Sequence, residues 1–185
     1  TDALLEGHFV LSSGLHSPKY IQCAKLLSYP HLAGSICKSL AKKIKNNFKH
    51  IDIILAPAMG GIIIGYEIGK ILKKETIFCE RVKGKFTLRR GFKIKKGSKV
   101  LIIEDVITTG KSSIECVKLI KKANAKLVGF ASIIDRSVKK NLKIKKKLIS
   151  HLKIDVPVYK KDNLPKELSS VKITKPGSRF IKWKD

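Results

Sequence analysis

The chain has 185 residues and carries 40 lysines and arginines against 14 aspartates and glutamates, a formal net charge of +26. This length suits one domain with a small appendage, long enough to bury a core without disulfide or metal crosslinks. No stretch reaches the ~18 apolar residues of a membrane span, and no leader pattern begins the chain, so we expect a cytoplasmic protein without membrane partners.

The positive charge is spread evenly along the chain. Lysine accounts for 35 of the 40 basic residues, and aromatic residues make up only 6% of the sequence. With few rings on which bases could stack, specific nucleic-acid binding is not expected. The four cysteines form no C-x-x-C pair, which predicts buried free thiols rather than a zinc site or a disulfide framework. They are Cys23, Cys37, Cys79 and Cys116.

The N-terminal part predicts a small flap followed by a helix. Residues 8–29 contain two short apolar runs joined by a turn rich in serine, glycine and proline, which is typical of two strands in a hairpin. Residues 1–30 are therefore expected to form a hood. Residues 31–48 place apolar side chains at four-residue intervals, which predicts an amphipathic helix.

A β-α unit, a further strand and a basic insertion follow. Residues 51–56 predict a buried strand, and the paired glycines Gly60 and Gly61 open an apolar helix through residue 72. Residues 76–80 predict another strand. The segment 81–95 then stands where a helix would be expected, and we predict a mobile basic loop or hairpin there.

Residues 100–113 are the most informative stretch. An apolar strand reaches Glu104 and Asp105, and a Thr-Thr-Gly turn then leads into a predicted helix. Such a helix start offers free N–H groups to an anion, which predicts a phosphate site flanked by carboxylates. It is neither a Walker loop nor a dinucleotide fingerprint, because Gly110 lacks the partner glycines that both require.

The order of apolar strand, Glu-Asp, two residues and Thr-Thr-Gly resembles the phosphoribosyl pyrophosphate signature of the type I phosphoribosyltransferases. The resemblance implies an α/β fold with a central, mainly parallel sheet flanked by helices and a small N-terminal hood. It also implies a set of residues that bind the ribose phosphate. They are Glu104, Asp105, Val106, Ile107, Thr108, Thr109, Gly110, Lys111 and Ser112.

Other segments resemble the orotate phosphoribosyltransferases within that family. The pattern from Phe9 to Tyr20 is similar to their amino-terminal segment, which implies that Tyr20 helps to cover the base. Ser12 stands where many members carry lysine. Met59 and Gly60 stand where many members carry a Tyr-Lys pair, in the loop that faces the pyrophosphate. Backbone N–H groups would therefore have to bind the pyrophosphate there in place of the lysine.

The basic insertion is similar to the catalytic loop of the same enzymes. That loop closes over the site of a neighbouring subunit, so the resemblance implies a homodimer. It also implies catalytic roles for Arg81, Lys83 and Lys85 in stabilising the leaving pyrophosphate, with Asp105 at the ribose.

The last third of the chain supplies the argument for the base. A predicted strand at residues 127–134 ends at Arg136, which resembles the arginine that binds the carboxylate of orotate. Residues 139–147 predict a solvated turn and helix face, and residues 154–159 a last edge strand. The tail at residues 175–179 is similar to a shorter branch of the family.

The implied reaction joins orotate to phosphoribosyl pyrophosphate and gives orotidine monophosphate and pyrophosphate, a step of pyrimidine biosynthesis. Mg²⁺ is the implied cofactor, with Glu104 and Asp105 contacting the ribose hydroxyls directly or through the water shell of the metal. Two alternatives stay open. One is a purine phosphoribosyltransferase, which shares the central motif. The other is a nucleic-acid-binding regulator that uses the same fold as an effector sensor.

Overall fold

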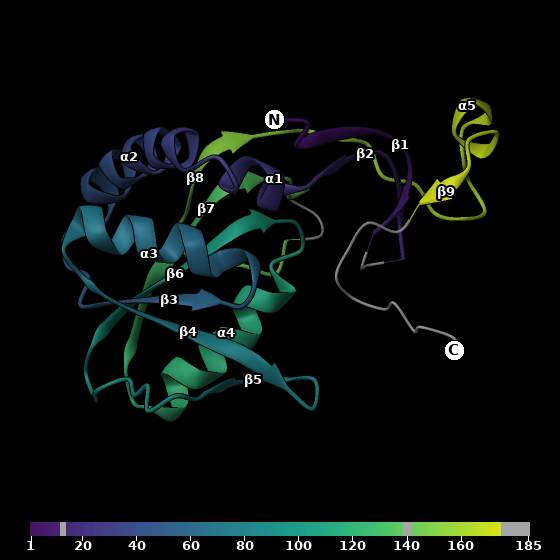
Figure 1. The fold of residues 1–185 in the computed structure, drawn as a ribbon. Coiled ribbons are helices and arrows are strands. Elements are labelled where there is room, and N and C mark those ends of the chain that lie inside the picture. Colours follow the sequence, from purple (N-terminus) through teal and green to yellow (C-terminus); the bar gives the residue numbers. More distant parts are fainter. Residues whose placement is uncertain (12–13, 139–141, 175–185) are drawn as a thin grey trace. The chain divides into compact units, whose positions relative to one another are not determined.

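The computed structural model describes residues 1–11, 14–138 and 142–174 (Figure 1). The chain forms two compact units. One comprises Leu27–Ile154, and the other comprises Thr1–Leu26 together with the segment that begins at Asp155. Ser12, the first three residues of the lysine-rich segment 139–147 and the tail at residues 175–179 lie outside the described residues.

A six-stranded sheet forms the centre of the larger unit. The strand order is β5-β4-β3-β6-β7-β8, and every neighbouring pair is parallel except the antiparallel pair β4 and β5 at one edge. The predicted α/β class with a mainly parallel sheet is confirmed. The strands are β3 (Ile53–Pro57), β4 (Glu75–Val82), β5 (Lys85–Leu88), β6 (Lys99–Ile107), β7 (Lys126–Asp135) and β8 (Leu148–Lys153).

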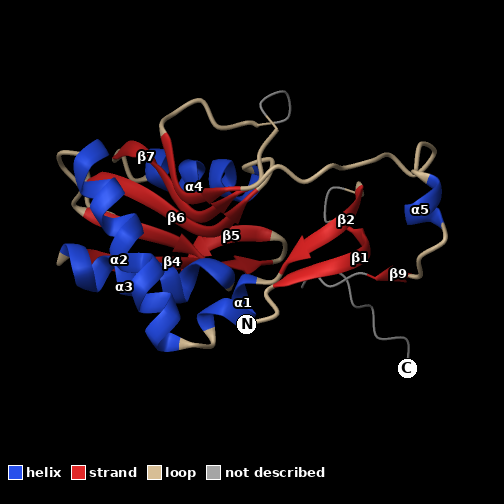
Figure 2. Cartoon of the chain, turned by 90° about the horizontal axis from the view of Figure 1, so that it is seen from above, coloured by secondary structure: helices blue, strands red, loops and turns tan. Residues whose placement is uncertain are grey.

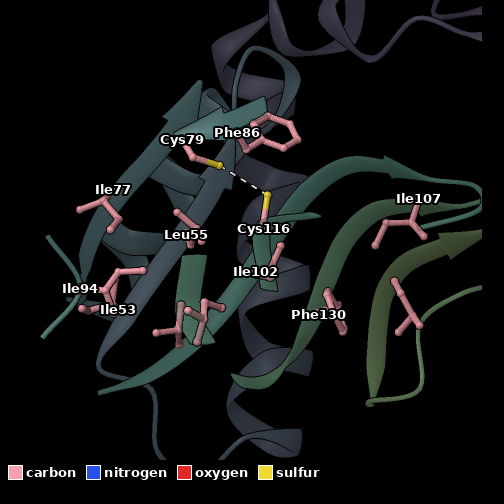
Figure 3. Close-up of a cluster of buried hydrophobic side chains, with 13 residues drawn as sticks. Ile53, Leu55, Ile77, Cys79, Phe86, Ile94, Ile102, Ile107, Cys116 and Phe130 are labelled. Carbon is pink, nitrogen blue, oxygen red and sulfur yellow. Dashed lines mark hydrogen bonds between the residues drawn. The ribbon is translucent and has the colours of Figure 1, made fainter. Parts of the chain in front are cut away.

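Helices cover both faces of this sheet (Figure 2). Helices α2 (Pro30–Asn47) and α3 (Gly60–Leu72) pack on each other and on one face, where a Cβ at Gly65 would lie 2.8 Å from that of Ala56. Side chains alternate along a strand, so the neighbouring Leu55 points to the other face. There it joins a buried cluster with Cys116 of α4 (Lys111–Lys122), shown in Figure 3.

The order in which successive strands are added to the sheet reverses between the parallel neighbours β3 and β6. Helix α3 leads from β3 to β4 on one side, whereas α4 leads from β6 to β7 on the other. The loops that leave the carboxyl ends of β3 and β6 therefore diverge. In open α/β sheets such a reversal opens the crevice where ligands bind.

The smaller unit is a three-stranded sheet. Strands β1 (Leu4–Val10) and β2 (His16–Ile21) form the predicted hairpin, and β9 (Ile173–Thr174) lies parallel to β1. Tyr159 forms an isolated bridge with His16. The N-terminal flap is thus built together with the C-terminal segment, which the sequence did not indicate. Two short helices, α1 (Cys23–Leu27) and α5 (Lys166–Ser169), complete the described elements.

Three sequence predictions are corrected. The last strand of the large sheet is β8, whereas residues 154–158 form no strand, because Pro157 lacks an N–H and the chain there leaves to join the smaller unit. The described residues 142–147 form no helix. Strand β6 continues through Glu104 and Asp105 to Ile107, so both carboxylates lie within the strand rather than at its tip.

A pair of buried histidines joins the two ends of the chain within the smaller unit. His8 Nδ1 lies 3.2 Å from the carbonyl oxygen of Val171, and His8 Nε2 lies 2.6 Å from His16 Nδ1. A carbonyl only accepts, so His8 donates from Nδ1 and accepts at Nε2 from His16. The arrangement therefore depends on one unprotonated ring nitrogen between the two histidines.

We expect the smaller unit to loosen under mild acid. Burial first, and then the proximity of His8 and Lys161, lowers the pKa of His16 from its ordinary value of 6.5. The unfolded chain therefore binds more protons, and stability is lost as the pH falls below about 6.5. The protection of β1 amides against hydrogen exchange, corrected for the intrinsic change of the exchange rate with pH, should be lower at pH 5.5 than at pH 7.5, and His16→Gln should reduce that difference.

His151 provides a matched control. It lies on β8 in the larger unit, and burial also lowers the pKa of this histidine. The His151→Gln variant should leave the pH dependence of exchange in β1 unchanged. Equal protection factors in β1 at both pH values in the unmodified protein would contradict the assignment.

Candidate functional site at the carboxyl edge of the sheet

The loop after β3 meets strand β6 at Gly60 and Asp105. A Cβ added to Gly60 would lie 2.6 Å from Cγ and 2.7 Å from Oδ1 of Asp105, so only glycine leaves room for this carboxylate. The next glycine, Gly61, would place its Cβ 3.0 Å from the carbonyl oxygen of Ile103. The backbone of the first loop therefore lies directly against the acidic end of β6. The Ala58–Met59 peptide bond of the same loop is cis.

The two carboxylates of β6 have different surroundings. Glu104 is buried and accepts a hydrogen bond from Ser113 Oγ of α4 at 2.5 Å. Burial raises the pKa of the Asp105 carboxyl, and hydrogen bonds from the backbone of Val106 and of Asp105 itself partly offset that rise. Glu104 is thus fixed by a helix, whereas Asp105 is partly buried and lies against Gly60.

The Thr-Thr-Gly turn leads directly into α4. Gly110 occupies the N-cap position with a φ of 70°, a left-handed conformation that favours glycine, and no side chain caps the helix there. The side chains of Ile144 and Leu142 pack where a Cβ of Gly110 would stand. The backbone N–H of Lys143 also donates to the carbonyl of Thr109 at 3.0 Å. This packing holds the uncapped helix start in place as a site for an anion.

Arg136 is held at the same edge by its backbone. Its N–H donates to the carbonyl of Ile107, the last residue of β6, at 2.8 Å. Asp135 Oδ1 accepts the N–H of Ser137 at 2.7 Å, which turns the chain at the end of β7. The predicted carboxylate-binding arginine therefore emerges beside the Thr-Thr-Gly turn.

The predicted catalytic cations lie on a hairpin. Arg81 is on β4, Lys83 is in the turn, and Lys85 begins β5. Both lysines are exposed and have no ion pair with any residue in the described part of the chain. Arg81 is different, because its guanidinium forms an ion pair with Glu115 of α4 at 2.7 Å.

The predicted residues thus fall into three groups. The first group lies where β3, β6 and β7 end and in the residues that follow them: Met59, Gly60, the run from Glu104 to Ser112, and Arg136. The second group is on the β4–β5 hairpin: Arg81, Lys83 and Lys85. Tyr20 belongs to the smaller unit, on β2, where its ring centre lies 5.7 Å from that of Phe9. Its predicted contact with the base stays a prediction.

Sequence reasoning missed two residues, Ser113 and Glu115. Both belong to α4, and their partners Glu104 and Arg81 are 9 and 34 residues away along the chain. The one available signal was an acidic side chain inside a helix otherwise rich in lysine.

The oxygens at this edge suit a hard divalent cation. Mg²⁺ prefers oxygen ligands, keeps several waters, and is commonly held by one or two carboxylates together with substrate phosphates. Asp105 offers a carboxylate beside the crevice, next to an anion site at the start of α4. The donor set therefore fits a metal that is shared with a phosphorylated ligand.

Comparison with known proteins identifies the class of protein. A family model described as a phosphoribosyl transferase domain matches residues 29–159. A relative from Parvibaculum lavamentivorans, named orotate phosphoribosyltransferase, is 50% identical over 180 residues, covering 97% of this chain and 92% of that protein. One of the same name from Caldicellulosiruptor saccharolyticus is 46% identical, covering 98% and 94%. The chain therefore belongs to the phosphoribosyl transferase family, in its orotate phosphoribosyltransferase branch.

Solved structures share the fold. An orotate phosphoribosyltransferase from Aeropyrum pernix superposes with a TM-score of 0.68 at 21% identity, covering 82% of this chain and 88% of that one. An adenine phosphoribosyltransferase from Saccharomyces cerevisiae gives a TM-score of 0.63 at 18% identity, covering 72% and 86%. The fold by itself therefore does not separate the two kinds of base.

We predict that Gly60→Ala disrupts the site. The added methyl group would displace the Asp105 carboxylate, and misplacement by about 1 Å can cost about a hundredfold in rate. Binding of phosphoribosyl pyrophosphate, measured by calorimetry, should weaken about tenfold or more, on the same reasoning.

Gly34→Ala is the control for this substitution. Gly34 lies in α2, and no atom stands within 4 Å of its would-be Cβ. This variant should gain about 0.5–1 kcal/mol of stability, as expected for alanine inside a helix, and should bind normally. Normal binding by Gly60→Ala would show that Asp105 does not contribute to the site.

Proposed function

We infer that the protein transfers the ribose phosphate of phosphoribosyl pyrophosphate to orotate, giving orotidine monophosphate and pyrophosphate. One observation carries this inference beyond the family name. The backbone of Arg136 is hydrogen bonded to the last residue of the strand that precedes the phosphate turn. This contact brings the backbone of Arg136 next to the turn, which supports the proposal that its guanidinium binds the carboxylate of orotate.

The chemistry requires charge stabilisation at two places. Cleavage of the anomeric C–O bond develops positive charge on the ribose and negative charge on the leaving pyrophosphate. We propose that Glu104 and Asp105 accept hydrogen bonds from the ribose hydroxyls. The N–H groups and hydroxyls of residues 108–112 hold the 5′-phosphate, supported by their position at the start of α4. Catalysis then rests on positioning and electrostatics rather than on a covalent intermediate.

Mg²⁺ is part of the proposal. Asp105, with Glu104 through water, would hold it together with the substrate, where it would neutralise phosphate charge. Backbone N–H groups near Met59 and Gly60 and the cations of the β4–β5 hairpin would receive the pyrophosphate. Tyr20 would cover the base.

A substrate panel tests the proposed function. Pyrophosphate release should be rapid with orotate and at background level with uracil, adenine and hypoxanthine, because only orotate presents a carboxylate to Arg136. Arg136→Gln should weaken orotate binding about tenfold or more, the effect of losing one charge-assisted hydrogen-bonding group. The KM for phosphoribosyl pyrophosphate should stay unchanged.

The alternatives give different results in the same assay. Turnover with adenine or hypoxanthine would identify a purine enzyme. Absence of turnover together with salt-sensitive binding to DNA or RNA would identify a regulator.

No helix in the described part of the chain is long and apolar enough to cross a membrane. We retain a cytoplasmic location in the proposal, supported by four cysteines that are all buried free thiols.

We further propose that the protein is a homodimer that uses one face of α3. Met59, Ile63 and Tyr66 lie at helical spacing, and they are 80%, 50% and 65% exposed. Large apolar side chains clustered on one helix face mark an interaction surface. A second copy is the occupant that the proposed reaction favours, because in the family the basic loop completes the neighbouring subunit's site.

Charge on this face should separate the subunits. Ile63→Glu and Tyr66→Glu each place a carboxylate in the proposed apolar contact, so the molecular mass measured by light scattering should fall to that of one chain. Lys121→Glu, at an exposed position of α4, is the control for the added charge and should leave the mass unchanged. A mass of one chain for the unmodified protein at micromolar concentration would contradict the dimer.

A further inference from the structure

We propose that Glu115 is a positioning residue, which holds Arg81 and thereby sets the hairpin that carries Lys83 and Lys85. This inference rests on the proposed function, because it assigns the leaving-group role to the two lysines. Arg81 is then the anchor of the hairpin rather than a ligand of pyrophosphate.

The Arg81 guanidinium is held on three sides. Nη2 lies 2.7 Å from Glu115 Oε2, and Nη1 donates to the carbonyl of Gly84 at 2.6 Å. The guanidinium carbon lies 4.0 Å from the centre of the Phe86 ring. The side chains of Arg81 and Glu115 are only 28% and 25% exposed, so the pair is partly shielded from water. A planar guanidinium that satisfies a carboxylate, a carbonyl and a ring together is well defined in position.

These contacts tie the hairpin turn to a helix. Gly84 is in the turn between β4 and β5, Phe86 is on β5, and Glu115 is on α4. Beside them, Cys79 of β4 and Cys116 of α4 bring their sulfurs within 3.4 Å in the buried cluster of Figure 3. Arg81 therefore connects the rigid core to the residues on either side of Lys83.

Helix α4 relates this anchor to the reaction. The helix begins at Lys111, immediately after the Thr-Thr-Gly turn, and Glu115 lies one turn further along. The element that binds the ribose phosphate at its start thus fixes the basic hairpin by its side. A shift of the hairpin relative to α4 would move its cations relative to the phosphate site.

Ion pairing in the hairpin region differs between the arginines and the lysines, which supports different roles for them. Arg81 is neutralised by Glu115, and Arg89 and Arg90 approach Glu80 at 3.8 and 3.3 Å. Lys83 and Lys85 are exposed and have no such carboxylate within the described ranges. An unpaired lysine on a flexible stem can reach a phosphate without first breaking an ion pair, which favours the lysines as the groups that meet pyrophosphate.

The competing possibility is that the Arg81–Glu115 ion pair breaks when the substrate binds; we call this a latch. Arg81 would then leave Glu115 and bind the pyrophosphate, so Glu115 would compete with the substrate for Arg81. Removal of the Glu115 charge would then assist the reaction, whereas removal of a positioning residue impairs it. The two possibilities predict opposite signs for the same substitution.

The test is Glu115→Gln, assayed with orotate and phosphoribosyl pyrophosphate. We expect kcat to fall about tenfold and both KM values to stay within about twofold, as when an interaction needed for orientation is lost. Exchanging the charges, with Arg81→Glu and Glu115→Arg together, should recover part of the kcat lost by either single change, because the ion pair is restored.

Glu67→Gln is the matched control. It removes an acidic partner of Lys70, 3.9 Å away on α3, by the same substitution and far from the hairpin in sequence. It should leave kcat and both KM values unchanged. Hydrogen exchange in residues 81–88 should accelerate in Glu115→Gln and not in Glu67→Gln.

Three outcomes would overturn the proposal. An unchanged or increased kcat/KM in Glu115→Gln would favour the latch or a residue without influence on the reaction. A lower melting temperature with unchanged kcat would indicate a purely structural ion pair. Failure of the charge exchange to recover any kcat would indicate that Arg81 itself meets the substrate. The proposed function is tested separately, by turnover of the unmodified protein.

Discussion

The contact between Gly60 and Asp105 is the constraint on which the site depends. Strands β3 and β6 are neighbours, yet their following helices leave to opposite sides, so the two loops diverge above the sheet. At this edge the backbone of Gly60 and the Asp105 carboxylate meet with no room for a Cβ. The backbone proposed to bind pyrophosphate is thereby brought next to the carboxylate proposed to bind the ribose.

Helix α4 contacts several other parts of the proposed site. Ser113 fixes the buried Glu104, the uncapped start at Gly110 offers N–H groups to a phosphate, and Glu115 receives Arg81 from the basic hairpin. These contacts lie within the first five residues of the helix and its cap. Small changes in the orientation of α4 would therefore affect binding of the ribose phosphate and placement of the hairpin together.

The net charge of +26 does not by itself identify the cations of the site. Among the arginines near the site, Arg81, Arg89 and Arg90 each have an acidic partner, and the acidic residues are few enough that such pairing is selective. A chain with so many lysines could offer cations almost anywhere. Which cations matter is decided by the position of the few carboxylates.

The sequence by itself determined the class of fold and the centre of the site. Apolar periodicity and the pattern of residues 100–113 indicate which residues are buried and which form a strand or a helix. They can do so because these properties depend on near neighbours in the chain. They predicted the strands, the phosphate turn and the place of Arg136 at a strand end, whereas the mainly parallel sheet was implied by the family resemblance. The branch of the family followed from motif resemblance, and relatives of that name bear it out.

The tertiary structure decided what depends on residues distant in sequence. Local patterns did not show that the C-terminal segment completes the N-terminal sheet, or that residues 154–158 leave the large sheet. Nor did they pair Arg81 with Glu115, or Gly60 with Asp105. The physical reason is that a pattern reports how far a side chain is buried, whereas the order of the strands and the packing of α4 determine which partner it meets.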